Sequence, residues 1–157
     1  MVVNTNTIDG DRGGSSHGRI LVPEGCNVLT AQLVDACYQV HRAMGPGLLE
    51  VVYERCVEWE LRRRGLEVEC QKPIDVRYGD LILPAAFRVD MLIGDDQGHQ
   101  IIGEFKCQSQ MPPVFQAQLI SYLRFLNLPV GLLVNFHNHY FKEGVSRLLN
   151  TSWKAGA

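Results

Sequence analysis

Apolar residues recur at helical spacing in three segments of the chain. In residues 30–44 they follow one another at intervals of three or four, with Thr30 where an N-cap is expected. Residues 48–64 repeat the pattern after a Gly-Pro-Gly break and end on three arginines, with Gly65 as the C-cap. Residues 114–126 form the third segment. The side chains expected to face inward from the second helix are Leu49, Val52, Tyr53, Cys56 and Leu61.

In most of the remaining segments apolar and polar residues alternate, as is typical of strands. Short strands are predicted at residues 66–71, 73–78 and 81–85, with Gly79-Asp80 as a hairpin turn. Residues 87–107 predict two further strands joined by a polar turn. Residues 130–136 are uniformly apolar, which indicates a central strand covered on both faces.

This order of elements predicts an α/β or α+β layered domain, with a mixed sheet of four or more strands and helices packed on it. Residues 28–150 are expected to form one domain, in which residues 144–149 add a short final strand or helix. Residues 1–27 are rich in Gly, Ser, Asn and Asp and predict a flexible leader. Residues 151–157 are expected to be a frayed tail.

Composition narrows the function classes. With 157 residues and 46% hydrophobic content, the chain suits one domain with a single site. A net charge of −2 argues against a generally basic nucleic-acid coat. The sequence lacks an apolar run of about 20 residues and a signal-peptide pattern, so we expect a cytoplasmic protein without a membrane partner. Five scattered cysteines suggest reduced thiols rather than a disulfide framework or a zinc site.

The predicted hairpin of residues 87–107 carries charges where strands are otherwise apolar. Glu104 and Lys106 share a face because they are two residues apart, and the hairpin can bring Asp90 beside them. Two carboxylates and an ammonium on one face are costly unless they bind something, and hard oxygen ligands suit Mg²⁺ or Mn²⁺. The bare pattern equally allows a cross-strand salt bridge on a solvated face.

Two neighbouring segments favour the metal site. Glu50 and Tyr53 lie about one turn apart after the Gly-Pro-Gly break, and Glu54 lies one turn beyond Glu50. Gln118 and Tyr122 share a face of the helix that follows the Glu104 strand.

These motifs, in this order, resemble the GxxExxY protein family of the PD-(D/E)xK nuclease-like superfamily. The resemblance covers about residues 29–149 and rests on VHRAMGPGLLEVVYERCVEWELRRRGLEV, FRVDMLI, IIGEFKC, QAQLISYLRFL and VGLLVNF. It implies a restriction-endonuclease-like core in the order αβββαβ, which agrees with the fold predicted from periodicity. One departure is Gly103, where relatives often have an apolar residue, and this could loosen the strand near the metal.

The resemblance also implies roles for particular residues. Asp90 and Glu104 would be metal-binding carboxylates, Lys106 the catalytic lysine and Glu50 an additional acidic metal ligand. Gln118 would be the polar residue that contacts the site or the nucleic-acid backbone. We therefore expect a nuclease that uses Mg²⁺ or Mn²⁺ to hydrolyse phosphodiester bonds, with DNA as the expected substrate.

Alternatives stay open at this point. The chain could be a non-catalytic nucleic-acid-binding or accessory module that keeps the nuclease-like fold. It could also be an oligomeric scaffold in which the carboxylates merely pair with Lys106. A homodimer or another protein partner is compatible with either reading.

Overall fold

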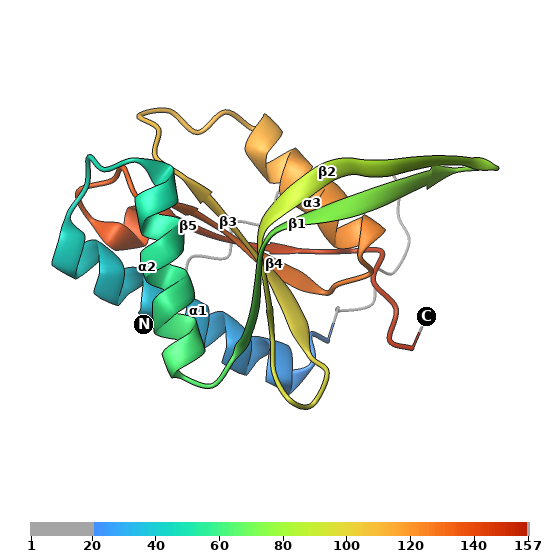
Figure 1. Cartoon of the computed structure of the whole chain (residues 1–157), viewed down its shortest axis with the longest axis horizontal. Helices are drawn as coiled ribbons and strands as arrows, with labels where there is room; N and C mark the ends of the chain where they lie inside the picture. The colour runs from blue at the N-terminus through green and yellow to red at the C-terminus, as the bar shows by residue number, and fades with distance from the viewer. Residues whose placement is uncertain (1–20, 157) are drawn as a thin grey trace, which may run out of the picture.

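The computed structural model describes residues 21–156, so most of the expected leader lies outside the described residues. Helices and strands follow one another in an order that Figure 1 shows from blue to red. The elements are α1 Glu24–Met44, α2 Glu50–Arg63, β1 Glu67–Tyr78, β2 Leu81–Gly94, β3 Gln100–Lys106, α3 Val114–Phe125, β4 Val130–Asn135, the 3-10 turn η1 Phe141–Gly144 and β5 Val145–Leu149.

The sheet is mixed and has five strands in the order β1-β2-β3-β4-β5. Only β3 and β4 are parallel among the paired strands of the described residues, and α3 makes the crossover between them. The predicted layered α+β fold with a restriction-endonuclease-like core is confirmed, and β5 adds a fifth strand to the αβββαβ order.

Apolar side chains fill both faces of the sheet. The larger core lies between the sheet and the α1–α2 pair, and the smaller core lies between the sheet and α3. Every residue of β4 is buried, because side chains that alternate along this strand enter one core or the other. The uniformly apolar sequence of β4 is the direct result of this double coverage.

Helix α1 begins at Glu24, six residues before the predicted N-cap at Thr30. The prediction was wrong because Thr30 lies inside the helix, where its hydroxyl donates to the carbonyl of Cys26 over 2.7 Å. Threonine can satisfy its hydroxyl in this way within a helix as well as at its start. Cys26 and Leu29 are both buried, so the added turns contribute to the core.

The loop before α2 is held by one buried side chain. The hydroxyl of Tyr53, which is fully buried, donates to the carbonyl of Gly45 and accepts from the backbone N–H of Leu48 over 3.2 Å. Its ring stacks on Phe136 with centroids 4.4 Å apart. Leu49, predicted to face inward, is instead 75% exposed because it precedes the first turn of α2.

Strands β1 and β2 form one long hairpin that projects beyond the body of the sheet (Figure 1). The short strands predicted at 66–71 and 73–78 are one strand, and residues 81–85 continue into the Asp90 strand. The register shifts between Ile74 and Val76. The side chain of Asp75 accepts from the N–H of Ala85 over 2.9 Å at this bulge. Sequence signals of interruption therefore mark irregular points inside continuous strands.

The helices found in residues 21–156 are too short or too polar to cross a membrane. All five cysteines are free thiols.

We expect Tyr53→Phe to destabilise the protein by about 1–2 kcal/mol, because the carbonyl of Gly45 and the N–H of Leu48 lose their partner while the ring packing is kept. Thermal unfolding measures this loss. Tyr38→Phe is the matched control, since Tyr38 is 38% exposed, and its effect should stay within about 0.5 kcal/mol. Equal effects of the two substitutions would contradict this account of the loop.

Candidate active site

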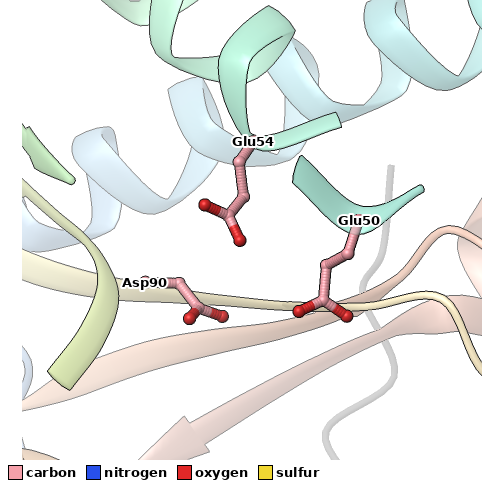
Figure 2. Close-up of side chains that lie close together, drawn as sticks. All are labelled: Glu50, Glu54 and Asp90. Atoms are coloured by element: carbon pink, nitrogen blue, oxygen red, sulfur yellow. The ribbon is translucent and has the colours of Figure 1, made fainter. Parts of the chain in front are cut away.

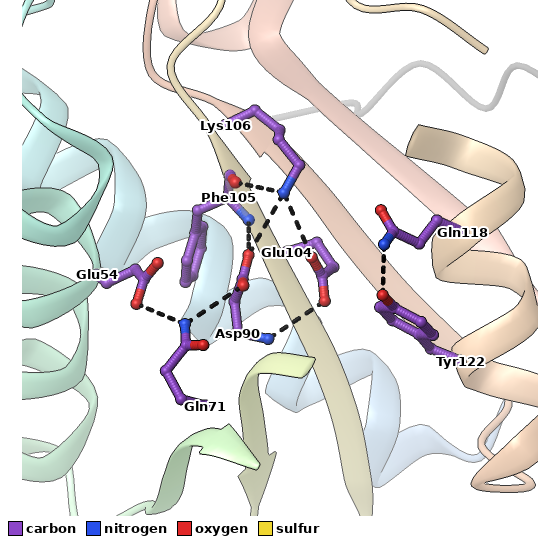
Figure 3. A network of polar contacts seen from close by, with 8 residues as sticks. All are labelled: Glu54, Gln71, Asp90, Glu104, Phe105, Lys106, Gln118 and Tyr122. Atoms are coloured by element: carbon purple, nitrogen blue, oxygen red, sulfur yellow. Dashed lines mark hydrogen bonds and ion pairs between the residues drawn. The ribbon is translucent and has the colours of Figure 1, made fainter. Parts of the chain in front are cut away.

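The candidate site forms where β2 and β3 stop pairing through their backbones. Their ladder ends at Met91 and Gly103. At the next position side chains replace the backbone partners. The N–H of Asp90 donates to Oε1 of Glu104 over 3.2 Å, and the N–H of Phe105 donates to Oδ2 of Asp90 over 2.9 Å. The two carboxylates thus satisfy the backbone of the strands that they separate, as Figure 3 shows.

Asp90 also lies at a break in side-chain alternation. Met91 belongs to the core under α1 and α2, whereas Val89 belongs to the core under α3. Because residues two apart share a face of a regular strand, this change places the irregularity at Asp90. The carboxylate of Asp90 can therefore contact groups from α2 and from β3 together.

Lys106 is the cation of the site. Its Nζ lies 3.6 Å from Asp90 Oδ2 and 3.5 Å from Glu104 Oε2, and it donates to the carbonyl of Phe105 over 2.9 Å. Its ammonium lies 5.4 Å from the ring centroid of Phe115 at the start of α3. The predicted convergence of Asp90, Glu104 and Lys106 is present in the structure.

A second group of carboxylates meets at Asp90 from the side of α2. Glu50 and Glu54 project from the first two turns of α2, and Figure 2 shows them pointing toward Asp90. One carboxylate oxygen from each of the three residues lies within 4.8 Å of the others. Glu50 begins α2 directly after the loop fixed by Tyr53, so that loop sets the position of its carboxylate.

Gln71 on β1 connects the two carboxylates nearest to it. Its Nε2 donates to Glu54 over 3.1 Å and to Asp90 over 3.4 Å. The backbone φ of Gln71 is +51°, a conformation that is rare for a residue with a side chain and that gathers at functional sites. This turn of the backbone coincides with the missing β1–β2 pair between Cys70 and Lys72.

The crowding of acidic groups raises several pKa values. Burial and the neighbouring Asp90 raise the pKa of Glu104 to about 8. Burial likewise raises the pKa of Glu50 and of Glu54. Burial acts to lower the pKa of Lys106, but the carboxylates of Asp90, Glu104 and Glu50 outweigh it and the pKa is raised. The carboxylates of the site thus outnumber the one ammonium, that of Lys106, which can neutralise them.

Helix α3 forms the opposite wall. The side chain of Gln118 donates to the hydroxyl of Tyr122, whose pKa is raised by burial and by Glu104 (Figure 3). Tyr122 in turn stacks on Phe87 of β2 with centroids 4.3 Å apart. Gln118 is exposed and its side chain bonds Tyr122 rather than a carboxylate of the site, so the structure places it at the rim of the site.

Gly103 precedes Glu104 without loosening β3. A Cβ added to Gly103 would lie 3.1 Å from Leu33 of α1 and 3.2 Å from the ring of Phe105. Glycine therefore allows α1 to pack closely against β3, which is paired on both sides of this residue. The predicted looseness is wrong at this position.

The structure regroups the residues predicted from the sequence. Asp90, Glu104 and Lys106 converge, and the group of three carboxylates with oxygens within 4.8 Å of one another contains Glu50, Glu54 and Asp90. Spacing had offered one signal for Glu54, its place one turn after Glu50. Gln71 gave no such signal, because a positive φ at a non-glycine residue cannot be read from sequence.

The model of the PD-(D/E)XK nuclease superfamily matches residues 27–148 of the chain. The chain belongs to this superfamily. The search of curated proteins and the search of solved structures gave no match. Asp90, Glu104 and Lys106 all lie within the matched residues.

The carboxylates that meet at Asp90 fit a hard divalent cation. Glu50, Glu54 and Asp90 offer only oxygen atoms, as Mg²⁺ and Mn²⁺ prefer. Two oxygens bound to one Mg²⁺ lie at most about 4.2 Å apart, so the three carboxylates need only close slightly. Gln71 joins two of them by hydrogen bonds and restricts how they can move.

We expect the stability of the metal-free protein to fall as pH rises from about 4.5 to about 8. The folded state holds the proton of Glu104 up to a pKa of about 8, whereas the unfolded chain releases it near the usual value of 4.5. Stability from this group is therefore complete below pH 4.5 and is lost through pH 8. Asp90, Lys106 and Tyr122 are the charged or titratable groups that face it.

Thermal unfolding in EDTA at pH 5.5 and pH 8 measures this dependence, and Glu104→Gln should flatten it. A change of 1 in a pKa corresponds to about 1.4 kcal/mol of folding free energy. From pH 5.5 to pH 8 the melting temperature of the parent should therefore fall by roughly 3 °C or more beyond that of Glu104→Gln. Glu67→Gln on the exposed part of β1 should behave like the parent. A parent-like fall in Glu104→Gln would contradict the assignment.

Proposed function

We propose that the protein is a metal-dependent nuclease that hydrolyses phosphodiester bonds of nucleic acid, with DNA as the first substrate to test. The observation that carries the proposal is the convergence of Lys106 with Asp90 and Glu104 at the splayed end of β2 and β3, beside Glu50 and Glu54. Superfamily membership supports the reaction class.

Asp90, Glu50 and Glu54 would hold Mg²⁺ or Mn²⁺, with Glu104 as the further carboxylate that Asp90 contacts. The bound cation would polarise a phosphoryl oxygen and lower the pKa of a water molecule. Two hydrogen bonds keep Asp90 in place. Its backbone N–H donates to the carboxylate of Glu104, and its carboxylate accepts from the side chain of Gln71.

Lys106 has a raised pKa and is held as a cation by its carboxylate neighbours. A fixed ammonium at this position would orient an attacking water by hydrogen bonding and stabilise the charge that develops on phosphate. Its contact with the carbonyl of Phe105 and its place above Phe115 limit the rotation of its long side chain. Lys106 is therefore assigned to positioning and charge stabilisation.

The subfamily proposal rests on the loop before α2. Gly47, Glu50 and Tyr53 have the spacing of the GxxExxY motif. Gly47 has φ +99°, Glu50 reaches the carboxylate group and Tyr53 fastens the loop. Each residue of the motif thus has its own structural role, which supports placing the chain in the GxxExxY family.

Purified protein should cleave DNA or RNA only when Mg²⁺ or Mn²⁺ is present, as gel analysis of labelled substrates would show. Lys106→Ala should lower the cleavage rate by about 100-fold or more, since a positioned group of this kind contributes roughly 10²–10⁴-fold. Lys72→Ala is the matched control, because the ion pair of Lys72 in the described residues is with Glu69 of β1 and not with Asp90 or Glu104.

Two results would contradict the nuclease proposal. One is the absence of metal-dependent cleavage across single-stranded and double-stranded DNA and RNA. The other is a Lys106→Ala variant as active as the parent. Retained binding of nucleic acid without cleavage would favour the accessory-module alternative instead.

A further inference from the structure

A polar cleft lies beside the candidate active site, on the face of the sheet that α3 covers. Its volume is about 290 Å³, near the lower end of small-molecule sites. Leu133 and Asn135 of β4 and Ser146 of β5 line it from the sheet, and Gln116 lines it from α3. The loop after β3 contributes Ser109, and η1 contributes Glu143. We call it the β4–α3 cleft.

The cleft lies on the strand next to the one that carries Glu104 and Lys106. Glu104 pairs with Leu133, and Lys106 pairs with Asn135, across the parallel β3–β4 ladder. Side chains opposite one another on neighbouring strands share a face, so the floor of the cleft is the next row of the surface that carries Glu104 and Lys106. Leu133 pairs in turn with Ser146, which extends the floor to β5.

The floor is built rather than incidental. Asn135 is 3% exposed, its Nδ2 donates to the carbonyl of Gln108 over 2.7 Å, and its Oδ1 accepts from the N–H of Gln108 over 3.1 Å. These bonds fix the loop after β3 at the edge of the cleft. A Cβ on Gly144 would lie 2.2 Å from the carbonyl oxygen of Asn135, so this wall requires glycine.

The lining chemistry indicates a neutral ligand with hydrogen-bonding groups. Lysine, arginine and histidine are absent from the lining found in residues 21–156, and Glu143 is its one acidic residue. This composition disfavours phosphate, which is recognised by cations and N–H donors. The side chains of Ser109, Gln116 and Ser146 make no hydrogen bond with other described residues, so they are available to a ligand.

We propose that the β4–α3 cleft binds an unpaired nucleobase of the substrate, next to the phosphate held at Lys106. This rests on the proposed nuclease function and specifies its substrate class. Carboxamides, hydroxyls and a carboxylate are the groups that read the edges of bases. A base seated in the cleft cannot stay paired and stacked in a duplex, so the substrate is single-stranded or carries an unpaired nucleotide at the cleavage position.

The test compares a substrate with a base to one without. Bis-p-nitrophenyl phosphate has a phosphodiester and no nucleobase, and a single-stranded oligonucleotide has both. Ser146→Leu fills the cleft with a larger side chain. Gln116→Ala removes a hydrogen-bonding group and keeps helix α3 stable, because alanine favours the helix. Both should lower kcat/KM for the oligonucleotide, Ser146→Leu by about tenfold or more, and leave hydrolysis of bis-p-nitrophenyl phosphate unchanged. Gln39→Ala on α1, outside the cleft and the site, is the control.

A binding measurement decides the proposal even if the parent cleaves nothing. With Ca²⁺ present, fluorescence anisotropy should show tighter binding of a single-stranded oligonucleotide than of the same strand made abasic, and Ser146→Leu should remove that difference. Failure to hydrolyse either substrate would count against the nuclease function alone. Equal binding of the two strands, equal loss on both cleavage substrates, or cleavage of a fully paired duplex as fast as a single strand would overturn the cleft assignment.

Discussion

The reciprocal hydrogen bonds between the carboxylates of Asp90 and Glu104 and the backbone N–H groups of Phe105 and Asp90 determine the rest of the site. Two strands that diverge leave backbone donors without ladder partners, and unpaired buried donors are costly. Here the carboxylates accept from those donors, so β2 can leave β3 and extend into the long hairpin with β1. The same contacts hold both acidic side chains at the opening and place Lys106 between them.

This arrangement concentrates negative charge that folding alone would not favour. Burial and mutual repulsion raise the pKa of Glu104, Glu50 and Glu54, and Gln71 adopts a positive φ to bridge two of the carboxylates. Unfavourable features that persist together at one place are characteristic of functional sites. A bound divalent cation would relieve this repulsion. The polar β4–α3 cleft lies on the neighbouring strand, where Asn135 pairs with Lys106.

Sequence patterns were sufficient for the fold class, the buried strand β4 and the convergence of Asp90, Glu104 and Lys106, because these depend on period and on local hairpin pairing. They did not predict the first turns of α1, because Thr30 resembles an N-cap in sequence. They also did not predict the continuity of β1 and β2, because a bulge or a non-glycine residue with positive φ resembles the end of a strand in sequence. Glu54 and Gln71 were missed as site residues. Glu54 had one sequence signal, its place one turn after Glu50, and Gln71 had none. The roles of both depend on how α2 and β1 approach a break in β2, which local periodicity does not show.

We propose that the splayed end of β2 and β3 is a divalent-cation site organised by Asp90. A crystal structure of the protein soaked in Mn²⁺, with anomalous scattering data, tests it most directly. We expect an anomalous peak within about 2.3 Å of a carboxylate oxygen of Asp90, with oxygens from Glu50 and Glu54 or from Glu104 also bound to the ion. The partners of the ion would also decide between those two carboxylate sets. A crystal in which Mn²⁺ binds fully at other positions, while Asp90 has no peak and stays paired with Lys106, would contradict this proposal.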